Sequence, residues 1–352
     1  GGSNGKTTTK ELMAAVLRQK LKTLWSEASF NNDIGVPLTL LNLEKSHRVA
    51  VLEVGTNHPG EIAPLVKIIR PSIGVITNIM REHLEFFGDE AGVASEEGML
   101  ARLLPDSGIL FLSGDNSWTP QIAAETKARV VKTGFGAGND WRAVEVSLDR
   151  KGARFRVNAP RAEYDGEYFI QLLGRHQVAN ALFAIAAGAE MGLTRTEIQR
   201  GLAECQPAKM RLQMWEWHGV TVLDDTYNAN ADSMLAALSV LKELPGNGRR
   251  LAVLGDMAEL GAQSDSAHAE VGRHAAELGA GQLFAVGKMA GVMAGAARAA
   301  GLARVVEFAD AETAALALKN FVKAGDVVLL KASRVTRLER VAEALKAETM
   351  GK

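Results

Sequence analysis

The first ten residues, GGSNGKTTTK, have a spacing that suits the binding of phosphate groups. Glycines at positions 2 and 5 can adopt backbone angles that other residues avoid, so that several N–H groups point at one anion. The Lys6 ammonium group would reach the terminal phosphates of a nucleotide, and the Thr7 hydroxyl would bind Mg²⁺. We therefore predict a phosphate-binding loop made of Gly2, Ser3, Asn4, Gly5, Lys6, Thr7 and Thr8.

The alternative is that these residues are a Gly/Ser-rich tail without a role. The helical pattern that follows, residues 8–19, favours the loop because the N-terminus of a helix attracts anions. Phosphate-binding loops normally follow a strand, and no strand precedes Gly1. We therefore expect the sequence to be a fragment that lacks at least one strand.

Two further side chains with suitable chemistry follow apolar runs. Glu53 ends the run VAVLEVG, where its carboxylate would bind Mg²⁺, although a solvated charge at a strand end is the alternative. His83 follows the run that ends at Ile79, and Mg²⁺ prefers oxygen ligands, so a core or surface histidine is the alternative there. Because parallel strands end at one edge of a sheet, we expect the loop, Glu53 and His83 to share a site.

Polar residues at the start of two predicted helices could bind a nucleoside. His176 and Asn180 are four residues apart and share a helix face, and an amide can read the edge of a base. Asp224 or Asp225, ahead of Tyr227, could hold a ribose hydroxyl. The alternatives are polar helix caps in the first case and an Asn/Asp-rich turn in the second.

The arrangement of apolar runs predicts an α/β protein with two domains. In the first, buried strands alternate with helical patterns, which indicates a mostly parallel sheet. Residues 140–171 instead alternate polar and apolar side chains, which predicts a small antiparallel part. The strands of the first domain are expected at 47–55, 71–79, 108–112 and 128–134.

A second α/β series begins near residue 208, which predicts domains at 1–207 and 208–352. The second domain reads as a doubly wound, Rossmann-like sheet, in which ligands bind at the carboxyl ends of strands. Its strands are expected at 219–225, 249–256, 281–287, 304–309 and 326–333.

Composition limits the possible functions. The chain has 352 residues, 47% of them hydrophobic and 23% charged, as in an ordinary globular protein. A formal net charge of −1 gives no reason to expect nucleic acid or a membrane surface as a partner. The single cysteine, Cys205, excludes an internal disulfide framework and favours a reducing compartment, the cytoplasm.

Several blocks together resemble one family, the ATP-dependent Mur ligases of bacterial cell-wall synthesis. Two of them favour the branch that joins D-alanyl-D-alanine to UDP-N-acetylmuramoyl-tripeptide, namely NNDIGVPLTLL and GDMAELG. A folylpolyglutamate synthase shares the loop and is the alternative among enzymes; a non-catalytic nucleotide-binding module is the other alternative. The remaining blocks are GSNGKTTTKE, EVGTNHPGEI, TNI with HLEFFG, GRHQVANALFA and DDTYNAN.

The resemblance implies a central ATPase domain and a C-terminal Rossmann-like domain, without the N-terminal UDP-binding domain of such enzymes. It implies a monomer that uses ATP and Mg²⁺ to form an acyl phosphate, which an amine then attacks. In that reaction Lys6 would stabilise the transferred phosphoryl group, Thr7 and Glu53 would hold one Mg²⁺, and His83 would lie near a second. Adenine and ribose contacts are expected from His176, Asn180, Arg211, Asp225 and Tyr227. Substrate contacts are expected from Asn31, Asn32, Asn228, Asn230, Lys331, Ser333 and Arg334.

One position departs from the family pattern. The family usually has a lysine after the histidine block, and CO₂ carbamylates it to give a carboxylate beside the metal. Glu97 stands at that position in this sequence. We predict that its carboxylate replaces the carbamylated lysine; the alternatives are that the function has been lost, or that Glu96 and Glu97 form a solvated helix face.

Overall fold

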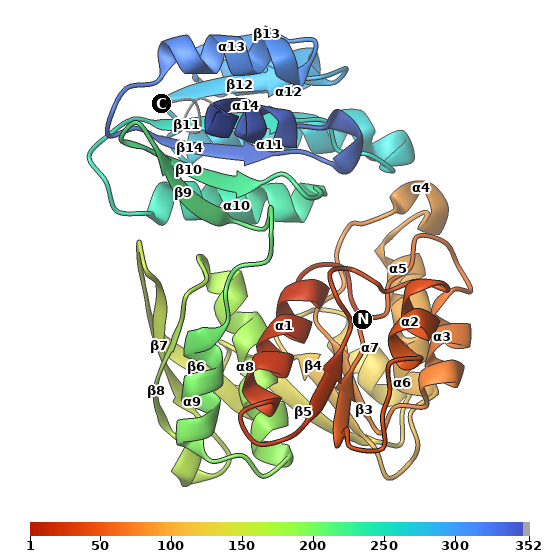
Figure 1. Cartoon of the computed structure of the whole chain (residues 1–352). Helices are drawn as coiled ribbons and strands as arrows, with labels where there is room; N and C mark the ends of the chain where they lie inside the picture. Colours follow the sequence, from red (N-terminus) through yellow and green to blue (C-terminus); the bar gives the residue numbers. More distant parts are fainter. Residues whose placement is uncertain (348–352) are drawn as a thin grey trace. The chain divides into compact units, whose positions relative to one another are not determined.

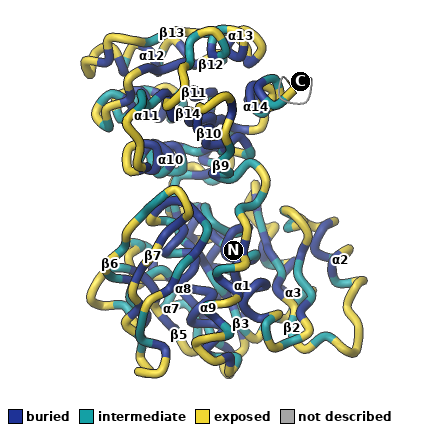
Figure 2. Tube along the Cα trace, turned by 60° about the vertical axis from the view of Figure 1, so that its left-hand side comes forward, coloured by how far each residue is buried: buried dark blue, intermediate teal, exposed yellow. Residues whose placement is uncertain are grey.

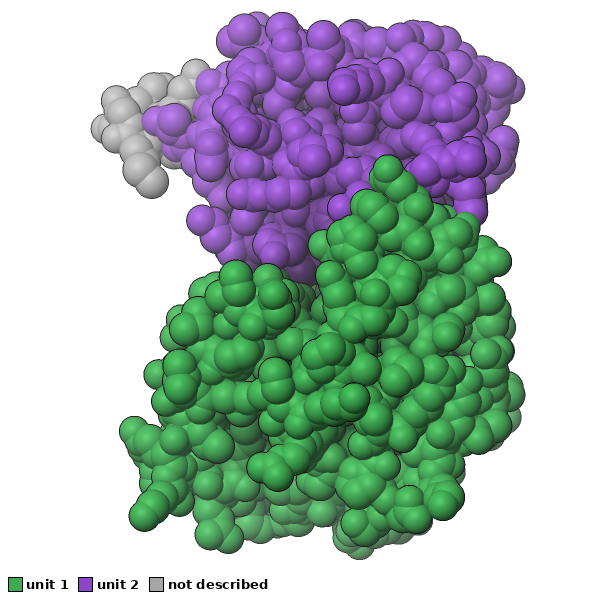
Figure 3. All heavy atoms as spheres, turned by 90° about the vertical axis from the view of Figure 1, so that its right-hand side faces the viewer, with its two compact units in different colours: residues 1–208 green, residues 209–352 purple. Residues whose placement is uncertain are grey.

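The chain forms two compact units, which Figure 3 colours separately. The structure is a computed structural model and describes residues 1–347. The first unit spans Gly1–Ala208, and the second begins at Lys209. No helix within the described residues has both the length and the apolar character needed to cross a bilayer.

The main sheet of the first unit has six strands in the order β3-β4-β5-β6-β7-β8 (Figure 1). Strands β3 to β6 are parallel, whereas β6, β7 and β8 are antiparallel. This confirms the expected mostly parallel sheet with an antiparallel part. The strands are β3 Ile73–Ile76, β4 Ile109–Ser113, β5 Arg129–Gly134, β6 Trp141–Asp149, β7 Gly152–Asn158 and β8 Gly166–Ile170.

A separate two-stranded parallel sheet pairs β1 (Thr23–Trp25) with β2 (Val49–Val51). Between β2 and β3 lies a partly open pocket of about 120 Å³, lined mostly by apolar residues. At its edge the Gly1 nitrogen donates to the carbonyl of Val75 at 2.9 Å, and Thr77 N–H donates to the carbonyl of Gly1 at 3.1 Å. The phosphate loop is therefore fastened to the end of β3.

Two buried helices form a large part of one hydrophobic core cluster in the first unit. Helices α1 (Lys6–Leu17) and α8 (Arg175–Glu190) are buried along most of their length (Figure 2). They pack their apolar residues against the main sheet in one cluster that includes Leu12, Phe111 and Phe183. The other helices are α2 Gly35–Leu40, α3 Ile62–Ile69, α4 Leu84–Phe87, α5 Glu90–Glu97, α6 Met99–Arg102, α7 Thr119–Ala124 and α9 Arg195–Glu204, with a 3₁₀ turn η1 at Ala162–Tyr164.

The second unit contains a six-stranded sheet in the order β13-β12-β11-β14-β10-β9. All neighbours are parallel except β9, which pairs antiparallel with β10. The doubly wound arrangement is as predicted, and β9 is an additional edge strand. The strands are β9 Gln213–Trp217, β10 Val220–Asp225, β11 Arg250–Gly255, β12 Gln282–Val286, β13 Val305–Phe308 and β14 Val327–Lys331. The helices are α10 Ala231–Glu243, α11 Ser264–Glu277, α12 Ala290–Ala299, α13 Ala311–Phe321 and α14 Glu339–Ala347, with 3₁₀ turns η2 Gly261–Gln263 and η3 Arg334–Thr336.

Candidate phosphate and metal site

The predicted phosphate loop runs directly into the N-terminus of α1. Gly2 and Gly5 have φ angles of 109° and 85°, in the left-handed region where a side chain would be strained. The loop is tied to the segment after β3, because Ser3 N–H donates to the carbonyl of Asn78 and Asn4 N–H donates to Asn78 Oδ1, both at 2.9 Å. The loop is thus held in place from two sides, by α1 and by the end of β3.

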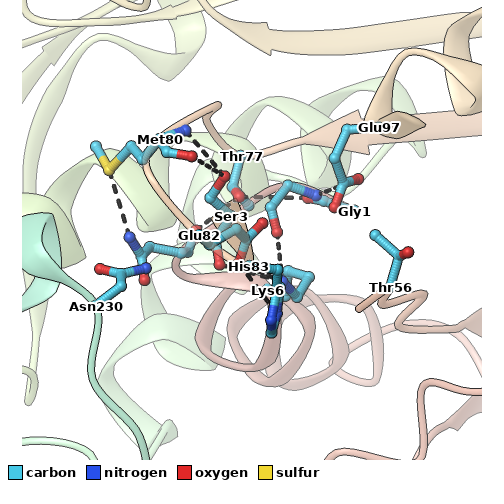
Figure 4. Close-up of polar contacts among 12 residues, drawn as sticks. Gly1, Ser3, Lys6, Thr56, Thr77, Met80, Glu82, His83, Glu97 and Asn230 are labelled. Atoms are coloured by element: carbon cyan, nitrogen blue, oxygen red, sulfur yellow. Dashed lines mark hydrogen bonds and ion pairs between the residues drawn. The ribbon is translucent and has the colours of Figure 1, made fainter. Parts of the chain in front are cut away.

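Lys6 turns back across this loop. Its Nζ donates to the carbonyls of Gly2 at 2.5 Å and Ser3 at 3.1 Å, and it lies 3.7 Å from Glu82 Oε2 (Figure 4). Burial raises the pKa of the Glu82 carboxyl group, and the nearby Lys6 charge opposes that rise. His83 Nε2 lies 3.9 Å from the same Glu82 oxygen. The structure therefore brings Lys6 and His83 together through Glu82, a residue that the sequence analysis did not select although it directly precedes His83.

Glu53 lies beside Thr7, as the sequence predicts. It is 4% exposed, so the alternative of a solvated charge is wrong. Its Oε1 accepts hydrogen bonds from Thr7 Oγ1 at 3.2 Å and from Asn31 Nδ2 at 2.8 Å. Its Oε2 has no hydrogen-bond partner among residues 1–347. The amide of Asn31, expected to contact substrate, is therefore part of the same cluster as Glu53.

Glu97 is completely buried beneath the phosphate loop. Its Oε2 accepts a hydrogen bond from Gly2 N–H at 2.7 Å, and Figure 4 shows the carboxylate pointing at the start of the chain. Its Oε1 is buried and lacks a hydrogen-bond partner in the described part of the chain. Glu96 is buried as well, and its carboxylate accepts from the N–H groups of Gly60 and Ile62 at 2.8 Å each. A solvated helix face is therefore the wrong interpretation of this pair, because both carboxylates are buried and accept hydrogen bonds from backbone N–H groups.

The available oxygen atoms fit Mg²⁺ better than a metal that needs a cage of side chains. Among the described residues no group of three His, Cys, Asp or Glu side chains is placed to hold a metal. Mg²⁺ commonly uses only one or two carboxylates, together with phosphate oxygens and water. Among residues 1–347, Glu53 Oε2 and Glu97 Oε1 are buried oxygens that accept no hydrogen bond, and the Thr7 hydroxyl lies beside Glu53. These hard oxygen donors match the predicted cation.

The start of α8 contributes Asn180 to the underside of the phosphate loop. Asn180 is 5% exposed, and its Nδ2 donates to Gln177 Oε1 at 2.9 Å. A Cβ added to Gly5 would lie 2.4 Å from Asn180 Oδ1, so the amide packs directly against the loop. His176, on the same helix, is half-buried. Gln177 was missed by the sequence analysis, although its spacing of three from Asn180 places both on one helix face.

In the second unit the expected nucleoside residues form a connected cluster. Asp225 accepts from Leu212 N–H at 3.0 Å and from Lys331 Nζ at 2.6 Å. The guanidinium of Arg211 lies 4.3 Å from the centre of the Tyr227 ring. Lys331 is 3% exposed and also donates to the carbonyl of Asn228 at 3.0 Å. Lys331 therefore acts here as a buried partner of Asp225.

Other expected substrate residues also have structural partners. Asn32 Oδ1 accepts from Gly35 N–H at 2.9 Å at the start of α2, and Asn230 caps α10. Ser333 Oγ donates to the carbonyl of Asp256 at 2.7 Å. The Arg334 side chain is 59% exposed and lies 3.4 Å from Glu339. Of this group, Arg334 offers the most accessible charge.

A glycine-rich loop that opens a helix, beside buried carboxylates and a parallel sheet, defines a phosphate-binding-loop protein of the α/β class. Residues 1–188 match the family Mur ligase middle domain, and residues 210–334 match the family Mur ligase, glutamate ligase domain. The chain belongs to the Mur ligase family.

Individual relatives resemble the chain over nearly its whole length. The UDP-N-acetylmuramoyl-tripeptide–D-alanyl-D-alanine ligase of Escherichia coli (strain K12) is 38% identical over 98% of this chain and 75% of its own length. The enzyme of the same name from Bacillus subtilis (strain 168) is 34% identical over 98% of this chain and 74% of its own length. A crystal structure of MurF from Acinetobacter baumannii superposes with a TM-score of 0.89 at 33% identity, covering 98% of this chain and 75% of that one. The crystal structure of a MurF ligase from Thermotoga maritima in complex with ADP superposes with a TM-score of 0.85 at 27% identity, covering 99% of this chain and 78% of that one.

Proposed function

We propose that the protein is an ATP-dependent, ADP-forming ligase that joins D-alanyl-D-alanine to UDP-N-acetylmuramoyl-tripeptide. The observation that carries the proposal is the phosphate loop, fixed between α1 and the end of β3 with Thr7, Glu53 and Glu97 around it. The ligase activity by which relatives that match 98% of the chain are named supports the choice of substrates.

The proposed reaction forms an amide bond in two steps. A carboxylate oxygen of the tripeptide attacks the γ-phosphorus of ATP, and ADP leaves with the electron pair of the broken P–O bond. The amine of D-alanyl-D-alanine then attacks the acyl carbon, phosphate leaves, and the amine gives up a proton. Both partners of the first step are negatively charged, so positive groups and N–H donors must stabilise the charge on the phosphoryl group.

The residues of the loop have distinct tasks in this proposal. The backbone N–H groups from Gly2 to Thr8 hold the phosphates, together with the N-terminus of α1. Lys6 Nζ, which now lies against the loop carbonyls and Glu82, stabilises the transferred phosphoryl group. Thr7 and Glu53 would hold one Mg²⁺, and Glu97 would help to hold a second beside His83. When bound, the cation would neutralise phosphate charge.

Each unit, taken by itself, offers candidate contacts to a nucleoside. In the first unit, the candidates are His176 and Asn180 of α8, because Asn180 packs against Gly5 of the phosphate loop. In the second unit, the stacked pair of Arg211 and Tyr227 supplies a flat surface, and Asp225 supplies a carboxylate for a ribose hydroxyl. Arg334 is the strongest of the proposed substrate contacts because its charge is exposed.

The test is ADP release by protein purified from the complete open reading frame. ADP release that requires both UDP-N-acetylmuramoyl-tripeptide and D-alanyl-D-alanine, with a product of the summed mass less water, supports the proposal. ATP binding by calorimetry without ADP release in the presence of both substrates would instead indicate a non-catalytic nucleotide-binding module. Release that responds to a folate and glutamate would indicate the folylpolyglutamate synthase alternative.

A further inference from the structure

Lys10 is a buried lysine that the proposed reaction does not use. It lies on α1, one turn after Lys6, and its side chain is 3% exposed. Its Nζ donates to the carbonyl oxygens of Ser26 at 2.7 Å and of Ala28, and lies 2.9 Å from Glu11 Oε1. A lysine is almost never so buried unless it is paired, and here three acceptors match its three N–H groups.

The segment that Lys10 holds, residues 26–31, contacts two members of the metal site. Ser29 Oγ lies 3.3 Å from Thr7 Oγ1, at hydrogen-bond distance. Asn31 Nδ2 donates to Glu53 Oε1 at 2.8 Å. One buried ammonium group is therefore linked, through a short stretch of chain, to both Thr7 and Glu53.

The segment needs such an anchor because its backbone is strained. Ala28 has a φ of 45°, in the left-handed region that a residue with a Cβ avoids. The carbonyl of this same residue is one of the Lys10 acceptors. Lys10 Nζ also lies 4.0 Å from Glu53 Oε2, the oxygen without a hydrogen-bond partner among residues 1–347. The cation therefore faces both the strained turn and the carboxylate.

We propose that Lys10 is a positioning residue for the Mg²⁺–phosphate site. It fixes residues 26–31 in their strained conformation, so that Ser29 and Asn31 hold Thr7 and Glu53 in place. The kinetic consequence rests on the proposed function, whereas the anchoring itself concerns only contacts within the chain and can be tested without substrate or metal.

Hydrogen exchange in nucleotide-free and metal-free buffer tests the anchoring. Lys10→Met keeps the length of the side chain and removes its charge and donors. The amides of Glu53 and Gly55 report on the segment, because they donate to Ser26 Oγ and to the carbonyl of Asn31. We expect about tenfold faster exchange of these two amides in the variant. Unchanged exchange in a folded Lys10→Met protein would overturn the proposal.

The matched control is Lys20→Met. Lys20 Nζ also donates to a backbone carbonyl, that of Gly192 at 2.6 Å, but at the surface and away from the loop. We expect this variant to leave the exchange of Glu53 and Gly55 at the wild-type rate. Faster exchange in both variants would show a general loosening of the unit and would contradict a specific role for Lys10.

The kinetic arm measures the Mg²⁺ concentration that gives half-maximal ADP release. We expect Lys10→Met to raise it, and the KM for ATP, about tenfold, with a smaller fall of kcat at saturating Mg²⁺. Lys10→Arg keeps the charge and the N–H donors and should recover part of the loss. A fall in kcat alone, without a change in the Mg²⁺ requirement, would contradict positioning of the metal site.

A second variant keeps the proposal testable if Lys10→Met does not fold. Asn31→Ala leaves Lys10 in place and removes the link to Glu53, so it should raise the Mg²⁺ requirement while the Ser26 amide, which donates to Val51, stays protected. An unchanged Mg²⁺ requirement would overturn the proposal. If the wild-type protein lacks ligase activity, the proposed function fails, but the exchange measurements still decide whether Lys10 anchors the segment.

Discussion

Replacing Glu97 with glutamine would remove one negative charge while it preserves the shape of the side chain. In the wild-type protein this carboxylate is fully buried, accepts a hydrogen bond from Gly2 N–H at 2.7 Å, and keeps Oε1 without a partner in residues 1–347. The variant therefore tests the phosphate loop and the proposed cation site together.

The interaction free energy that the Glu97→Gln variant loses can be worked out from these contacts. A hydrogen bond to a charged acceptor contributes about 1.5–3 kcal/mol, against about 0.5–1.5 kcal/mol for a neutral pair, so the bond to Gly2 weakens by about 1 kcal/mol. The new amide nitrogen would also be buried where Oε1 lacks a partner, at a cost of about 1–3 kcal/mol. Removing a buried charge offsets part of this cost. We expect a net loss of about 1.4–2.7 kcal/mol of interaction free energy at this site. Turnover at limiting Mg²⁺ should therefore fall about 10- to 100-fold.

The assay is ADP release across a series of Mg²⁺ concentrations. Glu85→Gln is the control, because Glu85 is exposed on the neighbouring helix α4 and its replacement changes the net charge equally. We expect Glu97→Gln to need more Mg²⁺, Glu85→Gln to behave as wild type, and the wild type to ignore removal of bicarbonate.

Glu97→Lys extends the test, since a lysine there should make activity depend on bicarbonate. Normal turnover of Glu97→Gln at limiting Mg²⁺ would refute the idea that this carboxylate replaces a carbamylated lysine.

Three other predictions concern separate parts of the chain. Lys6→Ala should reduce ADP release at least 100-fold without lowering Tm, because the lost contact acts on the transferred phosphoryl group. Circular dichroism would measure Tm, and the ADP-release assay would measure turnover. Near-normal turnover of the folded variant would remove Lys6 from the mechanism. Burial raises the pKa of Asp224, against a hydrogen bond from Thr226, so the ionised form costs stability as the pH rises through that raised pKa. Asp224→Asn should therefore raise Tm at about pH 7 but not below the ordinary aspartate pKa of about 4; equal shifts at both pH values would contradict this. Burial raises the pKa of the Cys205 thiol to about 12, so Ellman's reagent at neutral pH should label it only after unfolding, and fast labelling of the native protein would show that this thiol is accessible.

Much of the fold can be predicted from the sequence because buried strands and helices produce regular patterns of apolar residues. Strands β4 and β5 read as short apolar runs, and the antiparallel part reads as alternation, as in β7. Strands β1 and β9 were not predicted. The first is only three residues long, and the second is a partly exposed edge strand whose pairing with β10 comes from the tertiary fold.

The sequence predicted the site residues whose positions follow from strand order. It did not predict those whose role depends on side-chain burial. Thr7 and Glu53 meet because the loop and the end of β2 lie at one edge of parallel strands. The loop motif and the position of Glu53 at the end of an apolar run predict this meeting from the sequence. Glu82 and Lys10 are charged residues that read as solvated in a sequence, and only packing shows that both are buried. The same holds for Asn31, whose contact with Glu53 depends on the path of residues 26–31.

Strands β9 and β13 leave the two edges of the second sheet unpaired within the described residues. Each of these edge strands carries an exposed glutamate, Glu216 in β9 and Glu307 in β13. A charged side chain on an edge strand disfavours pairing with the edge of another molecule. Replacing both glutamates with uncharged β-branched residues should therefore promote self-association of the concentrated protein through these strands, which light scattering would detect.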